Sequence, residues 1–212
     1  MPQQERARIT REKILLAAAD VIRRVGFANA TLGDITEAAG VTKGALYFHF
    51  VSKEDIAHAV IDAQHRLCRE SADAVLAQGG TPVELMMRLC MDLAVRLMHD
   101  PIVRAGTRLT ADASTFETPL VDPYLYWMAT FEALATEAVE AGEFTTAVSP
   151  AQFSRVLIPS FTGVQLVSDS FTERADLPER IHELWLVLLN AAASESHREA
   201  LLAQAAEIFT VT

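Results

Sequence analysis

Four residues that lie close together carry side chains suited to phosphates and base edges. They are Thr42, Lys43, Tyr47 and His49, within the stretch VTKGALYFHF. Hydroxyl groups, a lysine ammonium and an imidazole are typical of contacts to a nucleic-acid backbone and to base edges in a groove. Gly44 lies among them and leaves room for a duplex to approach the chain. The pattern therefore points to nucleic-acid recognition.

Two short helices joined by a tight turn are expected to position these side chains. Thr31 and Asp34 have the spacing of a capping box, which predicts that a helix begins there. Gly40 supplies the left-handed conformation that ends this helix, and Thr42 caps the next one, whose free N–H groups suit an anion. Two such helices form a helix-turn-helix, which lays its second helix in the DNA major groove.

The same helices need apolar faces that pack on a core. We expect the inner faces to hold Ile35, Ala38 and Ala39 in the first helix and Ala45, Leu46 and Phe48 in the second. The alternative is an ordinary helical hairpin whose aromatic residues are simply core. The coincidence of a capped helix, a glycine turn and a basic second helix favours the DNA-binding interpretation.

The composition indicates an all-α protein. Half of the 212 residues are hydrophobic, only nine are Gly and eight are Pro, and alternation of period two is rare. Cys68 and Cys90 give no disulfide framework and are expected to be small buried side chains in a reducing compartment. No apolar run is long enough for a membrane span, and the first residues lack the apolar segment of a signal peptide. We expect a cytoplasmic protein.

Charge is distributed unevenly along the chain. The net charge is −10, yet residues 1–53 carry 8 Lys and Arg against 5 Asp and Glu, whereas the remainder carries 10 against 23 and has no lysine. Such asymmetry predicts a basic contact module on an acidic body. The acidic body argues against a protein that merely compacts DNA, because it would repel a second duplex.

Apolar periodicity and caps predict the remaining elements. Residues 1–9 are expected to be a mobile arm, with Arg6, Arg8 and the following Arg11 available to DNA, or else a plain solvated tail. A helix over 10–25, closed by Gly26, completes a three-helix module, and Ser52 with Asp55 caps a long helix that begins the body. Further helices are predicted over 82–98, 101–110, 122–142, 150–171, 178–190 and 194–209, with a loop at 111–121.

Two late segments, 156–167 and 184–193, are apolar nearly all round. Helices of this kind need burial on more than one side, which favours a homodimer. Two helix-turn-helix units about one helical turn apart would read a palindromic double-stranded operator.

The run TLGDITEAAGVTKGALYFHFVSKEDI resembles the DNA-binding segment of TetR-family repressors. Its pattern Gly-Val-(Ser/Thr)-x-Gly-x-(Leu/Ile)-Tyr-x-(His/Tyr)-Phe-x-(Ser/Gly)-Lys-(Glu/Asp) spans about residues 10–60. The resemblance implies a homodimer with a helix-turn-helix domain over 1–51 and a helical ligand-binding and dimerisation domain over 52–212. It also implies that Lys43, Gly44, Tyr47 and His49 contact DNA, and that Thr31, Thr42 and Lys53 help to hold its backbone.

The body resembles one subfamily, the γ-butyrolactone autoregulator receptors of antibiotic-producing actinobacteria. The resemblance rests on VRAGTRLT at 103–110, Trp127, SFTGVQ at 160–165 and ELW at 183–185. It implies a repressor of antibiotic production that a γ-butyrolactone, or a butenolide of the avenolide type, releases from its operator. In that subfamily a tryptophan matching Trp127 lies over the hormone ring.

A lactone with an alkyl tail needs an apolar slot, an aromatic wall and a few hydrogen-bond donors. Trp127 offers the wall. The expected polar anchors are Gln64, Thr130, Thr162 and Gln165, and the expected lining residues are Leu89, Leu93, Phe131, Phe161 and Val164.

Two alternatives remain at this point. A TetR-family pseudo-receptor or efflux regulator that answers to an antibiotic or another apolar compound would have a similar sequence. A helical metal-dependent enzyme would use His58, Asp62, His65 and Cys68, which follow one another at spacings of four, three and three. The absence of further ligands and of a nucleophile elbow, phosphate loop or HExxH motif argues against that enzyme. We expect no metal and no cofactor.

Overall fold

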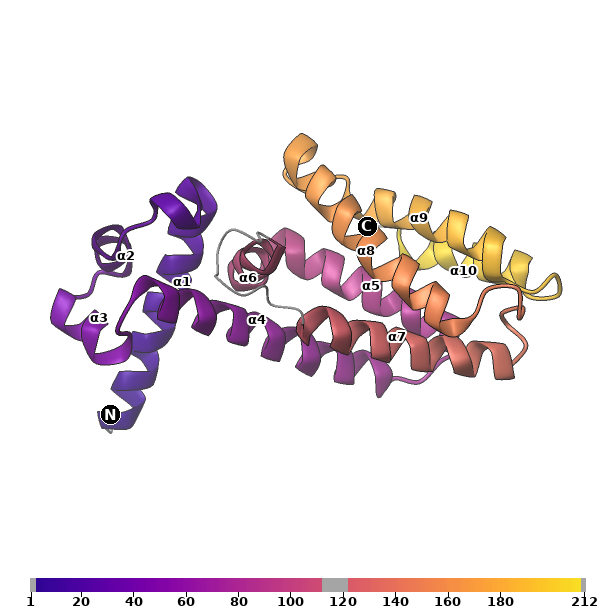
Figure 1. Cartoon of the computed structure of the whole chain (residues 1–212), viewed down its shortest axis with the longest axis horizontal. Coiled ribbons are helices and arrows are strands. Elements are labelled where there is room, and N and C mark those ends of the chain that lie inside the picture. The colour runs from indigo at the N-terminus through magenta and orange to yellow at the C-terminus, as the bar shows by residue number, and fades with distance from the viewer. Residues whose placement is uncertain (1–2, 112–121, 211–212) are drawn as a thin grey trace. The chain divides into compact units, whose positions relative to one another are not determined.

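The computed structural model describes residues 3–111 and 122–210, which form ten α-helices (Figure 1). In chain order they are α1 (Gln3–Asn29), α2 (Leu32–Ala39), α3 (Lys43–His49), α4 (Lys53–Leu76), α5 (Pro82–His99), α6 (Pro101–Ala111), α7 (Asp122–Glu140), α8 (Pro150–Thr172), α9 (Leu177–Ala192) and α10 (Arg198–Ile208). The prediction of an all-α fold is confirmed. Apart from Ala111, which ends α6, the predicted loop at 111–121 lies outside the described residues.

The helices gather into two compact units. One unit comprises Met1–Arg69 and His99–Leu120, so it contains α1 to α3, most of α4, and α6. The other comprises Glu70–Met98 and Val121–Thr212, so it contains the last turns of α4 together with α5 and α7 to α10. The boundary expected between residues 51 and 52 concerns the DNA-binding module and stays a prediction.

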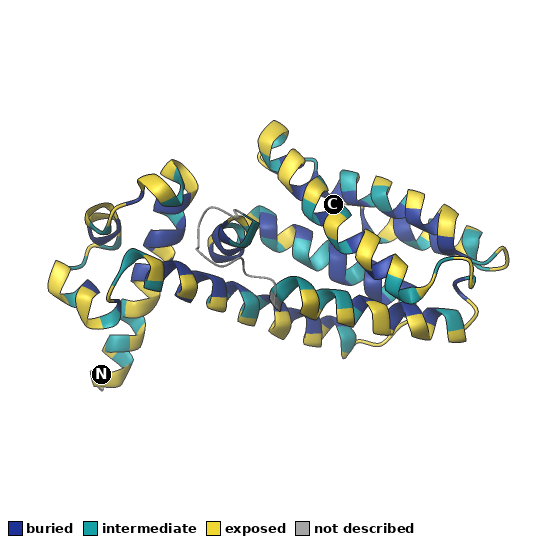
Figure 2. Ribbon diagram, viewed as in Figure 1, coloured by how far each residue is buried: buried dark blue, intermediate teal, exposed yellow. Residues whose placement is uncertain are grey.

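The first unit is built around α1, which packs against α2, α3 and α6 (Figure 1). Apolar side chains recur along α1 every three or four residues and face this core. Figure 2 shows the resulting buried face, whose fully buried members include Ile14, Ala18, Ile22, Ile35, Leu46, Ile56, Val60 and Leu109. The core therefore joins every helix of the unit.

α1 begins at Gln3, so the expectation of a mobile arm is wrong for the described residues before Thr10. Arg8 supplies a reason, because its guanidinium pairs with Glu5 at 2.6 Å and with Glu12 at 2.5 Å. Ion pairs three and four residues apart stabilise a helix. At the other end, Gly26 is non-helical (φ 78°, ψ 161°) but one more turn follows it to Asn29.

The inner face of α2 differs from the prediction in one residue. Ile35 is buried, but Ala38 is exposed and Thr36 is buried in its place. The Thr36 hydroxyl donates to the carbonyl oxygen of Gly33 at 2.8 Å. A threonine whose hydroxyl is satisfied by its own helix can pack as a small apolar side chain.

The second unit confirms most predicted helix starts. Ser149 Oγ accepts from the N–H of Gln152 at 3.3 Å, and Gln152 Oε1 accepts from the N–H of Ser149 at 3.1 Å, so α8 begins with a capping box. α8 packs against α7 and α9, and α10 packs against α9. Trp185 of α9 is fully buried, with its ring centroid 6.0 Å from that of Phe153 in α8.

α10 begins at Arg198, four positions after the predicted start at Ser194. Ser194 makes contacts distant in sequence instead: its hydroxyl donates to the Gly142 carbonyl oxygen at 2.7 Å, and its N–H donates to the Glu143 carbonyl oxygen at 2.8 Å. These bonds tie the segment before α10 to the turn that follows α7. Because the Ser194 hydroxyl bonds to Gly142, it does not cap a helix as predicted.

Cys68 and Cys90 are free and buried, which confirms their prediction as small core side chains. Burial raises the pKa of the Cys90 thiol to about 12. Within residues 3–111 and 122–210, no helix is long and apolar enough to cross a membrane.

Candidate nucleic-acid interface and effector site

The start of α2 is fixed by reciprocal hydrogen bonds. Thr31 Oγ1 accepts from the N–H of Asp34 at 3.1 Å, and Asp34 Oδ2 accepts from the N–H of Thr31 at 3.1 Å. Bonds from the Thr31 side chain and then its backbone lower the pKa of the Asp34 carboxyl. The predicted capping box is confirmed, and Thr31 lies exposed at the N-terminus of α2.

The turn between α2 and α3 also matches its prediction. Gly40 has a left-handed conformation (φ 62°), which a residue with a Cβ adopts only at a cost. Thr42 follows and caps α3, because its Oγ1 accepts from the N–H of Ala45 at 3.1 Å. The turn and the start of α3 are therefore fixed by contacts within a few residues of each other.

α3 has one buried and one exposed face. Leu46 and the C-cap residue Phe50 are buried, and their spacing of four places them on the same side. Lys43, Gly44 and Tyr47 are exposed, and Tyr47 keeps 55% of its surface in solvent. The structure thus leaves Lys43, Gly44 and Tyr47, three of the residues predicted to contact DNA, open to solvent on α3.

Phe48 was predicted to anchor α3 in the core, and that prediction is wrong. Its side chain is 78% exposed. The helical phase explains why: Leu46 and Phe50 point inward, so the residue halfway between them points outward. Its ring meets the half-buried His49 ring edge to face, with centroids 5.0 Å apart. The sequence contains a signal for this direction, because Leu46 and Phe50 are apolar and four residues apart, which places Phe48 on the opposite side.

The fold does not require a glycine at position 44. Gly44 lies in the first turn of α3, and a Cβ atom built on it would meet only Thr42 Oγ1, at 4.0 Å. A helical glycine is less stable than alanine by roughly 0.5–1 kcal/mol. The described fold therefore gives no reason for a glycine here, and an outside surface that approaches the backbone of α3 would give one.

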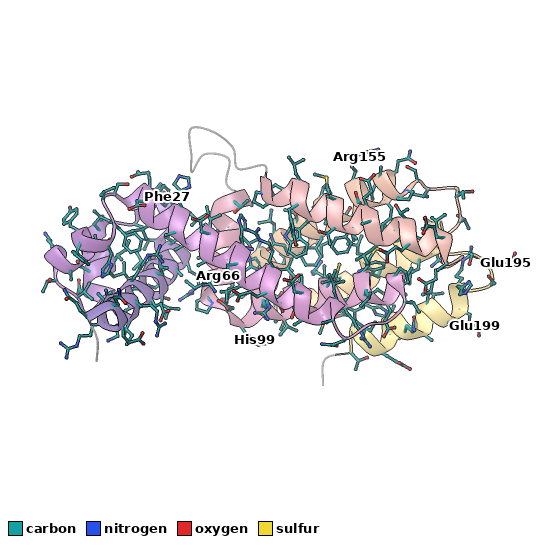
Figure 3. The ribbon with its side chains drawn as sticks, turned by 90° about the horizontal axis from the view of Figure 1, so that it is seen from below. Phe27, Arg66, His99, Arg155, Glu195 and Glu199 are labelled. Carbon is teal, nitrogen blue, oxygen red and sulfur yellow. The ribbon has the colours of Figure 1, made fainter. Side chains whose placement is uncertain are left out.

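Lys53 occupies the first position of α4 but points to the end of α1. Its Nζ donates to the carbonyl oxygens of Phe27 at 2.9 Å and Ala28 at 3.2 Å. The ammonium also lies 4.6 Å from the centroid of the Phe27 ring, which Figure 3 labels. These internal partners were not anticipated from the sequence.

The residues predicted to contact an effector are spread over four helices. Gln64 lies on α4, in the unit that holds the helix-turn-helix, and the others lie in the second unit. These others are Leu89 and Leu93 of α5, Trp127, Thr130 and Phe131 of α7, and Phe161, Thr162, Val164 and Gln165 of α8. Because α7 packs against α8, the structure places two of these groups on neighbouring helices.

Several of these side chains are already engaged. The half-buried Trp127 ring meets Tyr126 edge to face at 5.2 Å. The Thr130 and Thr162 hydroxyls each donate at 3.0 Å to a carbonyl one turn earlier in their own helix. Buried Gln165 accepts from Arg174 at 3.0 Å, while its Nε2 has no hydrogen-bond partner among the described residues. Gln165 therefore retains a donor for another group.

Val164 lies on a different side of α8 from buried Phe161 and Gln165. It lines a surface groove between α8 and α9 that is mostly apolar. The groove residues are Gly163, Val164, Val167, Arg180, Glu183, Leu184 and Val187.

The metal-enzyme alternative finds no support in the described residues. His58 and Asp62 are exposed, whereas Cys68 is buried, so the four side chains do not share one face of α4. Across the described parts of the chain, no cluster of three or more His, Cys, Asp or Glu side chains is arranged to hold a metal ion.

Residues 14–60 match the family of bacterial regulatory proteins called the tetR family, and residues 80–193 match the tetracyclin repressor-like C-terminal domain. The A-factor receptor protein of Streptomyces griseus is 35% identical over 193 residues, which cover 91% of this chain and 67% of that protein.

Solved structures agree with this result. The TetR family protein CprB from S. coelicolor A3(2) superimposes with a TM-score of 0.86 at 32% identity, covering 98% of this chain and all of that one. A γ-butyrolactone receptor described as ArpA-like superimposes with a TM-score of 0.83 at 33% identity, covering 96% of this chain and 98% of that one. CprB in complex with its biological operator sequence gives 0.85 at 33% identity, with 98% and 100% covered. The chain therefore belongs to the TetR family of bacterial regulatory proteins, and it is a regulator rather than an enzyme.

Proposed function

We propose that the chain is a ligand-responsive transcriptional repressor. It binds a palindromic operator as a homodimer and leaves it when a γ-butyrolactone or butenolide signal binds the C-terminal body. Its similarity to the A-factor receptor of S. griseus and to γ-butyrolactone receptor structures supports this signal class, and with it the control of antibiotic production. Such a regulator acts in the cytoplasm, where its operator is.

The main support for DNA binding by α3 is Gly44, a glycine that packing within the chain does not require. A Cβ there has space within the chain, so the benefit of glycine lies in what approaches from outside. Gly44 lies between Lys43 and the exposed Tyr47, which offer a cation and a hydroxyl to phosphates and base edges. We include His49 in this surface, with Thr31 and Thr42 at the starts of α2 and α3, where N–H groups face an anion. The DNA-binding domain is then residues 1–51.

The α8–α9 surface is our proposal for the dimer interface. Exposed apolar side chains are concentrated there: Val156, Leu166, Val167 and Phe171 on α8 and Val187 on α9. Gly163 also lines the groove, and a Cβ on it would meet nothing within 4 Å. As at Gly44, a helical glycine with free space suits a surface that another backbone approaches closely.

We place the effector on the second unit, around Trp127. The indole offers an aromatic wall, the Gln165 Nε2 offers a buried donor, and Phe131 and Phe161 supply apolar surface. Thr130, Thr162, Leu89, Leu93 and Val164 remain predicted contacts on this unit. Gln64 lies in the first unit, and its predicted contact is not part of this placement. Release follows only if the effector binds the DNA-free arrangement better than the DNA-bound one, and α4, whose residues run from one unit into the other, is the proposed lever.

The experiment begins with selection of duplexes by the purified protein from a random pool. A palindromic sequence is expected. Gly44→Ala should bind it at least about tenfold more weakly while unfolding at the same or a higher temperature, because the added methyl meets DNA but nothing in the protein. Equal binding by the variant would contradict the proposed interface.

Release is then tested on the selected duplex with synthetic alkyl γ-butyrolactones, alkyl butenolides and a panel of antibiotics. Release by a lactone or butenolide that Trp127→Ala abolishes, with DNA binding intact, supports the proposal. Release by an antibiotic alone would identify the alternative regulator, and a Trp127→Ala variant that still responds normally would refute the pocket assignment.

A further inference from the structure

Two lysines hold equivalent positions in successive helices yet have different surroundings. Lys43 is the first residue of α3 and Lys53 is the first residue of α4. Lys43 is exposed, whereas Lys53 is half-buried and donates to the Phe27 and Ala28 carbonyl oxygens. The two side chains therefore cannot be assigned the same role from their positions alone.

The start of a helix is an unfavourable place for a cation, because the N-terminal end of the helix dipole is positive. Lys53 offsets this by directing its ammonium at the C-terminal end of α1, where the dipole is negative. The last turn of α1 has no basic residue of its own. An ammonium can donate three hydrogen bonds, and two of them satisfy carbonyls that the end of a helix leaves free.

The backbone at Lys53 is itself fixed. Ser52 Oγ accepts from the N–H of Asp55 at 3.0 Å, and Asp55 Oδ2 accepts from the N–H of Val51 at 3.0 Å. At the other end of the contact, Phe27 and Ala28 follow Gly26, where α1 is locally non-helical. Lys53 thus joins the first turn of α4 to the last turn of α1. The non-helical residue Gly26 separates that last turn from the rest of α1.

We propose that Lys53 is a positioning residue, which fixes α1 to α4 and does not bind a DNA phosphate. α1 is the helix on which α2 and α3 pack, so its attachment to α4 sets where α3 is presented. This inference rests on the proposed DNA-binding function. The Lys53 contact would then carry a movement of the first turn of α4 through α1 to α3, the helix that we propose reads DNA.

The test compares the same substitution at both lysines, Lys43→Met and Lys53→Met, in the full-length protein. The dissociation constant for the selected duplex is measured over a series of NaCl concentrations. A phosphate contact contributes about 0.9 to the slope of log affinity against log salt. Lys43→Met should lower the slope by about that amount, whereas Lys53→Met should weaken binding about tenfold with an unchanged slope.

Hydrogen exchange in the free protein supplies the second readout. The Ala30 N–H donates to the Gly26 carbonyl oxygen at 3.1 Å across the last turn of α1. It should exchange faster in Lys53→Met and at the wild-type rate in Lys43→Met. Lys53→Arg should restore both the affinity and the slow exchange, because a guanidinium can donate to both carbonyls and stack on Phe27.

A lowered salt slope in Lys53→Met with wild-type exchange at Ala30 would overturn the proposal and make Lys53 a phosphate contact. If Lys53→Met does not fold, Lys53→Gln takes its place, since its shorter side chain keeps a polar amide and loses the charge. A wild-type protein that selects no duplex would refute the proposed function. Exchange at Ala30, measured without DNA, would still decide whether Lys53 holds α1.

Discussion

Gly106 and Gln64 pack so closely that a Cβ atom on Gly106 would lie 2.5 Å from the Cβ of Gln64. This contact holds α6 against α4 within the first unit. It also fixes Gln64, which is buried and donates to Cys68 Sγ at 3.3 Å. Gly106 is therefore required by packing inside the protein, in contrast to Gly44, which is surrounded by free space.

Gly106→Ala should lower the free energy of unfolding by roughly 1–3 kcal/mol, because the added methyl has to displace the Gln64 stem or the backbone beside it. Gly44→Ala is the matched control and should be neutral or stabilising by up to about 1 kcal/mol. Urea denaturation followed by circular dichroism measures both. Equal stabilities for the two variants would show that α4 and α6 yield at this contact.

Local signals in the sequence predicted most of the helix starts. The Thr31–Asp34 and Ser149–Gln152 pairs are confirmed as capping boxes. They were predictable because both partners lie within three residues of each other in the sequence. The late start of α10 could not be predicted in this way, since Ser194 bonds to Gly142, 52 residues earlier.

In the candidate sites, too, contacts between residues distant in sequence could not be predicted. Lys43, Gly44 and Tyr47 are exposed, as the motif predicts, but His49 is half-buried. Phe48 points outward instead of into the core, because its direction depends on helical phase rather than on residue type. Lys53 finds its partner 26 residues away, at a carbonyl that no sequence pattern marks. Val164, predicted to line the effector pocket, lines the surface groove and faces a different side of α8 from Phe161 and Gln165, because neighbouring residues of a helix face different sides. Its effector contact stays a prediction.

Phe48 and Phe50 give a paired test of the two faces of α3. Phe50→Ala should destabilise the fold by roughly 3–5 kcal/mol, because Phe50 is buried and its ring lies 5.1 Å from the Arg11 guanidinium. Phe48→Ala should change stability by less than about 0.5 kcal/mol, because the side chain is mostly in solvent. It should nevertheless weaken binding to the selected duplex, where an apolar ring can contact a thymine methyl group. Chemical denaturation and duplex titration separate these effects, and a Phe48→Ala variant that binds normally would remove this residue from the interface.

Asp176 makes the junction of α8 and α9 sensitive to acid. Its carboxylate accepts hydrogen bonds from Ser168 at 2.6 Å and Thr172 at 2.7 Å, and pairs with Arg180 at 2.7 Å. These bonds, that from Ser168 foremost, lower the pKa of Asp176 to about 2. In the unfolded chain the pKa is near the ordinary value of about 3.9.

A carboxyl whose pKa is lower in the folded state stabilises the fold above the unfolded pKa, and this contribution is lost as the pH falls through the folded pKa. Asp176→Asn should therefore melt below the wild type at pH 7, and the difference should shrink between about pH 5 and pH 2. Melting temperatures over this range provide the measurement. A difference that is constant with pH would mean that the carboxylate charge does not contribute.

The proposed dimer interface can be broken by one charge. Val187 of α9 is 68% exposed and lines the groove beside Leu184, so in a dimer a glutamate there would have to be buried without a partner. Val187→Glu should yield a monomer and lose most of its affinity for the palindromic duplex, because both half-sites must be bound together. Val95→Glu is the control, since Val95 is 40% exposed on α5 and lies outside the groove. Sedimentation equilibrium distinguishes the outcomes, and a Val187→Glu variant that remains dimeric would place the interface elsewhere on the molecule.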